Sequence, residues 1–133
     1  AHIDAETLSD NVASNTTLGI INESVYGKIP TGVSKELYSL WSNYRFQNGF
    51  AKGLSLGLGA THKGSSFADS LNLYKVPSYT VFDAAASYAI DEWELALNIK
   101  NITDETYYMN PTFSGALPGD PFGVYTTVRF NFN

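Results

Sequence analysis

Alternation of apolar and polar side chains at every second position, in segments of about ten residues, constrains this chain more than any other feature. Residues 122–133 read FGVYTTVRFNFN, with mainly apolar side chains at even positions and small or polar ones at most odd positions. This period of two is typical of an extended strand, because successive strand side chains point to opposite sides of a sheet. A helix would repeat its apolar positions every 3.6 residues.

Five further segments carry the same alternation, the first of them weakly. They are residues 2–8 (HIDAETL), 35–46 (KELYSLWSNYRF), 54–63 (LSLGLGATHK), 79–89 (YTVFDAAASYA) and 93–101 (WELALNIKN). Residues 18–21 predict one more short extended piece. Segment 54–63 sets leucines against serine and glycines, a bare face that a crowded or water-filled lumen explains better than solvent does. The prediction is an all-β chain of about six antiparallel strands.

The predicted connections alternate between long and short. Residues 9–31, 64–78 and 103–121 form long loops, whereas residues 47–52, with the Asn-Gly signal of a hairpin, and 90–92 form short turns. This asymmetry is typical of outer-membrane barrels. Aromatic residues recur beside the short turns and are predicted to form the inner membrane girdle: Tyr44, Phe46, Tyr88, Trp93, Phe130 and Phe132.

Composition excludes several classes of function. With 13 acidic and 8 basic residues the net charge is -5, which argues against nucleic acid binding because that needs clustered cations. There is no cysteine, and with only His2 and His62, far apart, we predict no metal site. No run reaches the roughly 18 to 20 apolar residues of a spanning helix. The first residues lack the pattern of a signal peptide, so any export signal would lie outside this chain.

The residues alone leave three architectures open. A soluble sandwich or ligand-binding β-barrel would bury the apolar faces, whereas an outer-membrane barrel would turn them to lipid. Tyrosine and other aromatic residues, 14% of the chain, suit a membrane interface or a binding surface. About six strands cannot close a membrane barrel, because the smallest have about eight. The chain is then either a complete small barrel of structural or adhesive function, with two strands unrecognised in its first third, or a segment of a larger barrel.

Motifs in residues 54–133 favour the larger barrel. In chain order they are Gly57, Gly59 and Gly64, then Asn72, Pro77, Tyr79 and Asp83, then LNIKNITDETY at residues 97–107, then Gly-x-Pro at residues 119–121 before a closing aromatic strand. In this order they resemble the C-terminal end of TonB-dependent outer-membrane siderophore receptors, and residues 28–46 resemble the preceding segment. Phe122 stands where that family often has an arginine, and Asn133 where it usually has a terminal phenylalanine.

The resemblance implies an antiparallel transmembrane β-barrel of about twenty-two strands around an N-terminal plug. Residues 1–133 would be a C-terminal part of that barrel, and the plug would lie outside them. A receptor of this kind imports ferric siderophores across the bacterial outer membrane with energy coupled through TonB. Its partners would be the ferric siderophore, the remaining barrel and plug, the TonB complex, and lipid or lipopolysaccharide. No cofactor held by protein side chains and no nucleic acid are expected.

Candidate site residues follow from the alternation and the resemblance. Structural residues facing the lumen are expected at Asp83, Arg45, Lys100 and Arg129. We expect Asp83 to form a structural hydrogen bond or salt bridge to the plug or barrel, with the three cations as the obvious partners. Loop aromatics could stack on or hydrogen-bond a siderophore, and we predict this for Tyr26, Phe67, Tyr74, Tyr107, Tyr108 and Phe113. Asn98 and Asn101 are interpreted as structural, at a bulge that redirects the strand.

No catalytic residue is predicted. Asp104 and Glu105 are adjacent and would point apart on a strand, which argues against a paired acid and base. An outer-membrane hydrolase would need a serine or aspartate beside a histidine on the upper lumen wall, and His62 is the only histidine placed for it.

Overall fold

The structure is a computed structural model, and it describes residues 1–8, 12–15, 20–112 and 114–132. Within these ranges no helix is long and apolar enough to cross a membrane. The chain divides into two compact units. The first comprises Ala1–Tyr38, His62–Tyr79 and Tyr107–Gly119, and the second comprises Ser39–Thr61, Thr80–Thr106 and Asp120–Asn133.

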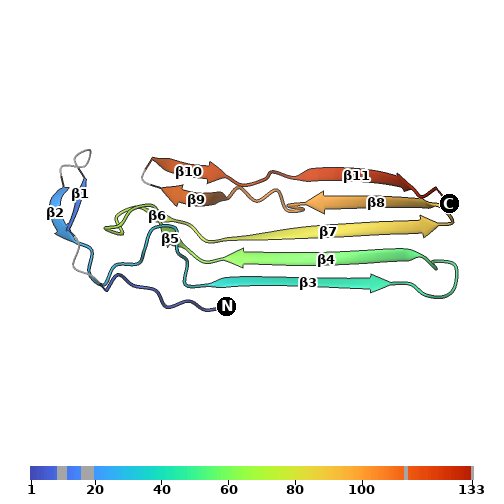
Figure 1. Ribbon diagram of the computed structural model, residues 1–133, viewed down its shortest axis with the longest axis horizontal. Coiled ribbons are helices and arrows are strands. Elements are labelled where there is room, and N and C mark those ends of the chain that lie inside the picture. The colour runs from blue at the N-terminus through green and yellow to red at the C-terminus, as the bar shows by residue number, and fades with distance from the viewer. Residues whose placement is uncertain (9–11, 16–19, 113, 133) are drawn as a thin grey trace. The chain divides into compact units, whose positions relative to one another are not determined.

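A five-stranded sheet forms the body of the second unit. Its strands are β3 (Leu37–Arg45), β4 (Leu54–Lys63), β7 (Tyr79–Ile90), β8 (Trp93–Lys100) and β11 (Gly123–Phe130). They lie in the order β11-β8-β7-β4-β3, and neighbouring arrows in Figure 1 point in opposite directions. The five strongly patterned segments are therefore confirmed as strands, with ends within three residues of those predicted.

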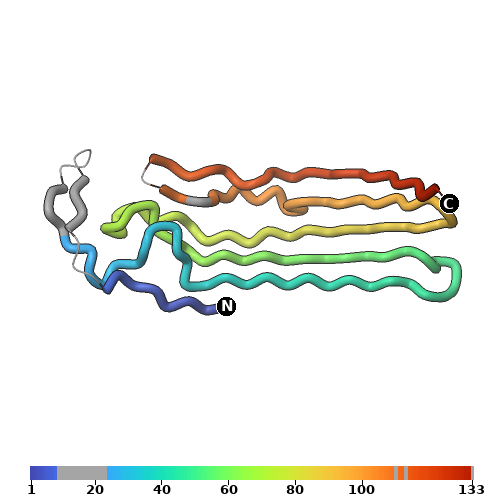
Figure 2. The backbone as a smooth tube through the Cα atoms, in the orientation of Figure 1, coloured from blue at the N-terminus to red at the C-terminus, as the bar shows by residue number. Residues whose placement is uncertain are grey.

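The two short connections lie at the same end of this sheet. Residues 46–53 join β3 to β4, and Asp91 and Glu92 join β7 to β8, as the tube in Figure 2 shows. Gly49 and Gly53 have φ of 75° and 92°, and Asp91 has φ of 49°. Glycine takes such left-handed angles without strain and aspartate tolerates them, so the sequence supplies suitable residues at both turns.

Strand register sorts the side chains onto two faces. Leu97 lies opposite Ala86 of β7 and opposite Thr126 of β11, so these residues share one side, here named the apolar face. The apolar face also carries Leu56, Leu58, Ala84, Ile99, Val124 and Val128. The opposite side, here named the polar face, carries Trp41, Asn43, Ser55, Gly57, Gly59, Ser87, Ala96, Asn98, Thr127 and Arg129.

The apolar face is not a soluble protein's core. Leu40, Leu58 and Val128 are 73%, 66% and 61% exposed, and only Val25, Leu71 and Val81 count as buried hydrophobic residues in the described part of the chain. A soluble sheet would cover such a face with a second layer, because each exposed leucine left in water forgoes about 1.5–3 kcal/mol of burial. The pattern fits a sheet whose apolar face meets lipid.

Three short hairpins belong to the first unit. They pair β1 (Val12–Asn15) with β2 (Ile20–Ser24), β5 (Ser66–Phe67) with β6 (Lys75–Val76), and β9 (Tyr108–Thr112) with β10 (Gly115–Pro118). Each lies inside a segment predicted to be a long loop. Alternation could not reveal them, because strands of two to five residues are too short to establish a period of two.

The weak strand predicted at residues 2–8 is wrong. This segment forms an isolated bridge between His2 and Glu36 and no strand of its own. Its other backbone hydrogen bonds include one from Ile3 N to Lys35 O and one from Thr7 N to Lys28 O. The extended piece predicted at residues 18–21 falls partly on β2, which begins at Ile20, and residues 18–19 lie outside the described ranges.

Candidate functional site

Trp41 places a large side chain on the polar face of the sheet. Its indole covers two glycines of β4: a Cβ added to Gly57 would lie 2.7 Å from Trp41 Cζ2, and one added to Gly59 would lie 2.6 Å from Cζ3. The glycines are therefore required by a neighbouring side chain on the same sheet. Beside the indole lies a hollow of about 250 Å³ with small and polar walls. It is lined by Trp41, Asn43, Ser55, Ala85, Ala86, Ser87, Ala96 and Asn98.

Asp83 forms a hydrogen bond, as expected, but its partner is a backbone group and not one of the three cations. Its Oδ1 accepts a hydrogen bond from the backbone N–H of Asn101 at 2.9 Å. Arg129 instead pairs with Glu94, directly opposite on β8, through Nη1 and Oε2 at 2.8 Å. Among the described residues, neither Arg45 nor Lys100 forms an ion pair. The sequence missed Glu94 as the partner, although its position opposite Arg129 follows once the register of the last hairpin is known.

Asn101 fastens the segment that follows β8. It is 2% exposed and has φ of 48°. Its Nδ2 donates to the carbonyls of Glu105 and Asp120, both at 2.9 Å, and its Oδ1 accepts from the N–H of Glu105 at 2.9 Å. The structural interpretation of Asn101 is borne out: the pairing of β8 is regular through Lys100, the left-handed Asn101 then redirects the chain, and Ile102 N donates to Phe82 O.

Asp69 organises the connection between β5 and β6. Its carboxylate accepts hydrogen bonds from the backbone N–H groups of Leu71, Leu73 and Tyr74 at 2.9, 3.1 and 2.7 Å. Three such charge-assisted bonds to one carboxylate hold a tight loop, and Asp69 is 7% exposed. The sequence reasoning did not single out this residue, because its role depends on backbone groups that only the folded loop brings together.

Asn72 ties the same connection to the segment before β3. Its Oδ1 accepts from Ile29 N–H at 2.8 Å, and its Nδ2 donates to Ile29 O at 2.7 Å. Asn72 has φ of 60°, a left-handed angle that asparagine tolerates better than most residues. The first residue of the motif that begins at Asn72 therefore has a structural role, because its side chain links two segments of the chain.

The predicted ligand-contacting aromatics belong to the first unit. Tyr26, Tyr74 and Tyr108 are 62%, 47% and 46% exposed. Tyr107 packs between the ring of Tyr79, at a centroid distance of 4.4 Å, and Gly119, where a Cβ would collide with its ring. Phe113 lies outside the described residues.

Phe67 lines a cleft of about 370 Å³ in the first unit. The other lining residues are Ile29, Ser34, Lys35, Glu36, Gly64, Ser65 and Lys75. Among the predicted aromatics that the structure describes, Phe67 alone lines this cleft. The two lysines were missed, although cations are few enough in this chain that a loop lysine near an aromatic residue is a usable signal. Lys35 is paired with Asp4 at 3.9 Å, and Glu36 adds a carboxylate, whereas Phe67 supplies an apolar surface and Lys75 a positive charge. An apolar ring and a cation in one cleft suit a bulky ligand that carries negative charge.

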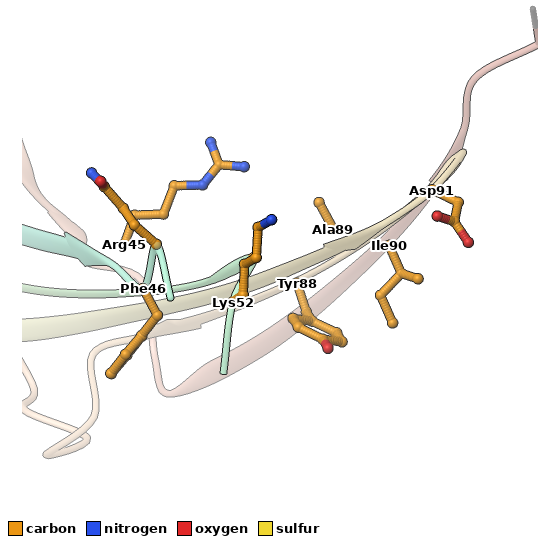
Figure 3. A pocket seen from close by; sticks show the side chains of 9 residues that line it. Arg45, Phe46, Lys52, Tyr88, Ala89, Ile90 and Asp91 are labelled. Atoms are coloured by element: carbon orange, nitrogen blue, oxygen red, sulfur yellow. The ribbon is translucent and has the colours of Figure 1, made fainter. Parts of the chain in front are cut away.

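A second cleft, of about 540 Å³, lies beside the two short connections in the second unit. Figure 3 shows Arg45, Lys52 and Ala89 on one side of the ribbon and Phe46, Tyr88 and Ile90 on the other. The cleft is thus cationic on one side and aromatic or aliphatic on the other.

Aromatic side chains cluster at the same end of the sheet. Trp93 lies 4.7 Å from Phe130, and Phe130 lies 4.7 Å from Phe132, measured between ring centroids. Tyr44 and Phe46 form an edge-to-face pair at 4.9 Å. Tyr88, near the end of β7, is 36% exposed. Phe46 and Tyr88 also line the cleft of Figure 3.

His62 lies on β4, where it contacts an aromatic side chain. Its ring stacks on that of Tyr38 at 6.1 Å, with an angle of 27° between the planes. In the part of the chain that the structure describes, no three histidine, aspartate or glutamate residues gather as metal ligands.

Comparison with known proteins places these features in a family. A sequence model described as "TonB dependent receptor-like, beta-barrel" matches residues 6–102. The ferrichrome outer membrane transporter/phage receptor of Escherichia coli K12 is 40% identical over 113 residues, which are 80% of this chain and 15% of the relative. The ferripyoverdine receptor of Pseudomonas aeruginosa is 29% identical over 130 residues, covering 91% of this chain and 16% of the relative.

The fold agrees with these sequence matches. The crystal structure of the siderophore receptor PiuA from Acinetobacter baumannii superimposes with a TM-score of 0.78 at 23% identity, over 97% of this chain and 18% of that one. The chain thus spans less than a fifth of the length of these relatives. Such proteins are receptors and transporters and not enzymes, which removes the hydrolase hypothesis built on His62. The chain belongs to the TonB-dependent receptor family, as a segment of its outer-membrane β-barrel.

Proposed function

We propose that this chain is the C-terminal part of the barrel of a receptor that binds ferric siderophores and imports them with energy coupled through TonB. The observation that carries the proposal is the 40% identity to a ferrichrome transporter over most of this chain. Within such a receptor the apolar face contacts lipid or lipopolysaccharide, and the polar face lines the lumen around a plug. Both edge strands, β3 and β11, then pair with further strands of the same barrel, because an open edge in lipid is costly.

The loops of the first unit are the proposed siderophore contacts. Tyr26, Tyr74 and Tyr108 expose rings that can stack on a chelate and hydroxyls that can hydrogen-bond it. Phe67, with Lys35 and Lys75 in the same cleft, adds an apolar surface and positive charge. The ferric siderophore is cargo, so no resident cofactor is proposed. Tyr107 and Phe113 complete the set of candidate aromatics.

The aromatic residues at the short-turn end of the sheet are the proposed periplasmic girdle. These residues are Tyr44, Phe46, Tyr88, Trp93, Phe130 and Phe132. Their rings sit where β3, β7 and β11 end and β8 begins, which is the level at which amphipathic rings anchor a barrel.

The binding proposal is tested on the receptor that contains this segment, titrated with ferrichrome and with ferripyoverdine while intrinsic fluorescence is followed. Tyr108→Ala is expected to raise the Kd of the bound siderophore about tenfold, which corresponds to about 1.4 kcal/mol. Tyr108→Phe should raise it less, because the ring remains. Phe50→Ala is the matched control, since Phe50 is fully exposed in a short turn. Equal effects of Tyr108→Ala and Phe50→Ala would contradict the loop contact, and binding of neither siderophore would contradict the assignment to these ligands.

A further inference from the structure

The cleft of Figure 3 holds two cationic side chains for which the described residues provide no partner. Arg45 ends β3, and Lys52 lies in the turn that follows. Neither side chain forms a hydrogen bond or an ion pair with another described residue. Asp91 lines the same cleft, but in Figure 3 it lies at the far end of the labelled group from Arg45.

Arg129, by contrast, is a cation on the polar face that has an acidic partner. It lies at the same end of the sheet and donates to Glu94 at 2.8 Å. The chain has only 8 cationic residues against 13 acidic ones, so two cations without a partner in one cleft are not explained by a general excess of positive charge. The cleft, at about 540 Å³, is large enough to admit side chains from another segment.

We propose that Arg45 and Lys52 bind a carboxylate side chain from a segment of the same receptor that lies inside the barrel and outside these residues. This inference rests on the proposed function, because it needs a barrel whose polar face encloses another part of the receptor. An enclosed guanidinium without a counter-charge is costly, whereas a carboxylate can accept two parallel hydrogen bonds from it. The ammonium of Lys52 then adds a third charge-assisted bond.

The direction of the side chains favours a partner on the polar face over a lipid headgroup. Arg45 and Lys52 project to the same side as Ala89, whereas the membrane-facing rings of Phe46 and Tyr88 project to the other. A phospholipid lies against the apolar face, so its phosphate would have to pass around the edge of the turn to reach Arg45. A protein carboxylate inside the barrel meets both cations directly.

The experiment is carbodiimide cross-linking of the intact receptor, followed by peptide mass spectrometry. The reagent joins an amine to a carboxylate in direct contact, so Lys52 is expected to form an isopeptide bond with an aspartate or glutamate from outside residues 1–133. Arg45→Lys should add a second amine and give a link to the same acidic residue. Lys52→Gln should abolish the link at position 52, whereas Lys63→Gln, on β4 away from the cleft, should leave it unchanged.

Two results would overturn the proposal. The first is a Lys52 that stays unlinked or links only to Asp91 or Glu92 of its own connection. The second is phospholipid that co-purifies with the receptor and is lost in the Lys52→Gln variant, as measured by native mass spectrometry, which would assign the cleft to a headgroup. Siderophore binding is measured on the same preparation. Retained binding without the cross-link would refute this inference and leave the proposed function standing.

Discussion

The indole of Trp41 covers Gly57, leaving no room for a side chain at that position: a Cβ there would lie 2.7 Å from Trp41 Cζ2. The ring extends over Gly59 as well. Trp41 is on β3 and both glycines are on β4, so one large side chain and two absent ones are complementary across a strand pair. The polar face is bare at this point because a neighbouring strand fills the space.

This complementarity predicts that the loss of stability caused by adding a methyl group at Gly57 depends on Trp41. Gly57→Ala should destabilise the receptor by about 1–3 kcal/mol, because overpacking forces the indole to move. In a Trp41→Ala background the same substitution should be neutral or stabilising, since alanine is favoured over glycine within a strand. Urea unfolding in detergent micelles of the four members of this cycle gives the coupling. An equal cost in both backgrounds would show that the ring does not set the requirement.

Asn101 should be the most sensitive polar residue after β8. Asn101→Ala removes three hydrogen bonds from a nearly buried site and places alanine at a left-handed angle. We therefore expect the free energy of unfolding to fall by about 3–5 kcal/mol. Asn101→Gly should cost about 1 kcal/mol less, because glycine adopts that angle without strain. Unfolding in denaturant measures the difference. Asn98→Ala, on the open polar face, is the control, and a loss as large as that of Asn101→Ala would contradict the specific role of Asn101.

Asp69 should control the opening of its loop. In Asp69→Ala, the backbone N–H groups of Leu71, Leu73 and Tyr74 lose their acceptor. Their hydrogen exchange is expected to accelerate about ten- to a hundredfold, which corresponds to about 1.4–2.8 kcal/mol of local stability. Mass spectrometry of peptides covering the loop measures this. Asp4→Ala, at an exposed carboxylate, serves as the control, and unchanged exchange in Asp69→Ala would refute the prediction.

The pair of Glu94 and Arg129 should contribute little to stability. Its side chains are 35% and 64% exposed, and exposed ion pairs usually contribute less than about 1 kcal/mol. We expect a coupling below that value from the cycle of Glu94→Gln and Arg129→Gln, and a smaller one at high salt. A coupling of several kcal/mol would mean that the assembled receptor shields the pair from water.

If Trp93 belongs to the proposed girdle, its fluorescence should report a position near the lipid headgroups. In a receptor whose only tryptophan is Trp93, brominated lipids should quench its fluorescence most strongly when the bromine lies near the headgroups. A receptor with Trp41 as its only tryptophan should be quenched weakly, because Trp41 lies on the polar face. Strongest quenching of Trp93 by bromines at the bilayer centre would contradict its place in the girdle.

Some parts of the fold could be predicted from the sequence alone, whereas others depend on tertiary structure. Alternation with a period of two was enough to predict the five long strands, because a side chain on a strand can reach only one face or the other. It failed for the hairpin of β9 and β10 and for residues 2–8, where pairing depends on a few backbone contacts. It also could not assign Arg129 to Glu94, since that requires the register of two strands.

The sequence by itself determined that this protein is a sheet with one apolar and one polar face, since that depends only on which residues alternate. Tertiary structure determined the roles of individual residues. Gly57 and Gly59 make room for Trp41, Asp69 and Asn101 satisfy backbone groups of turns, and Arg45 and Lys52 share a cleft. Each of these roles joins residues that are distant in sequence or depend on the folded backbone, so only the folded chain brings them together.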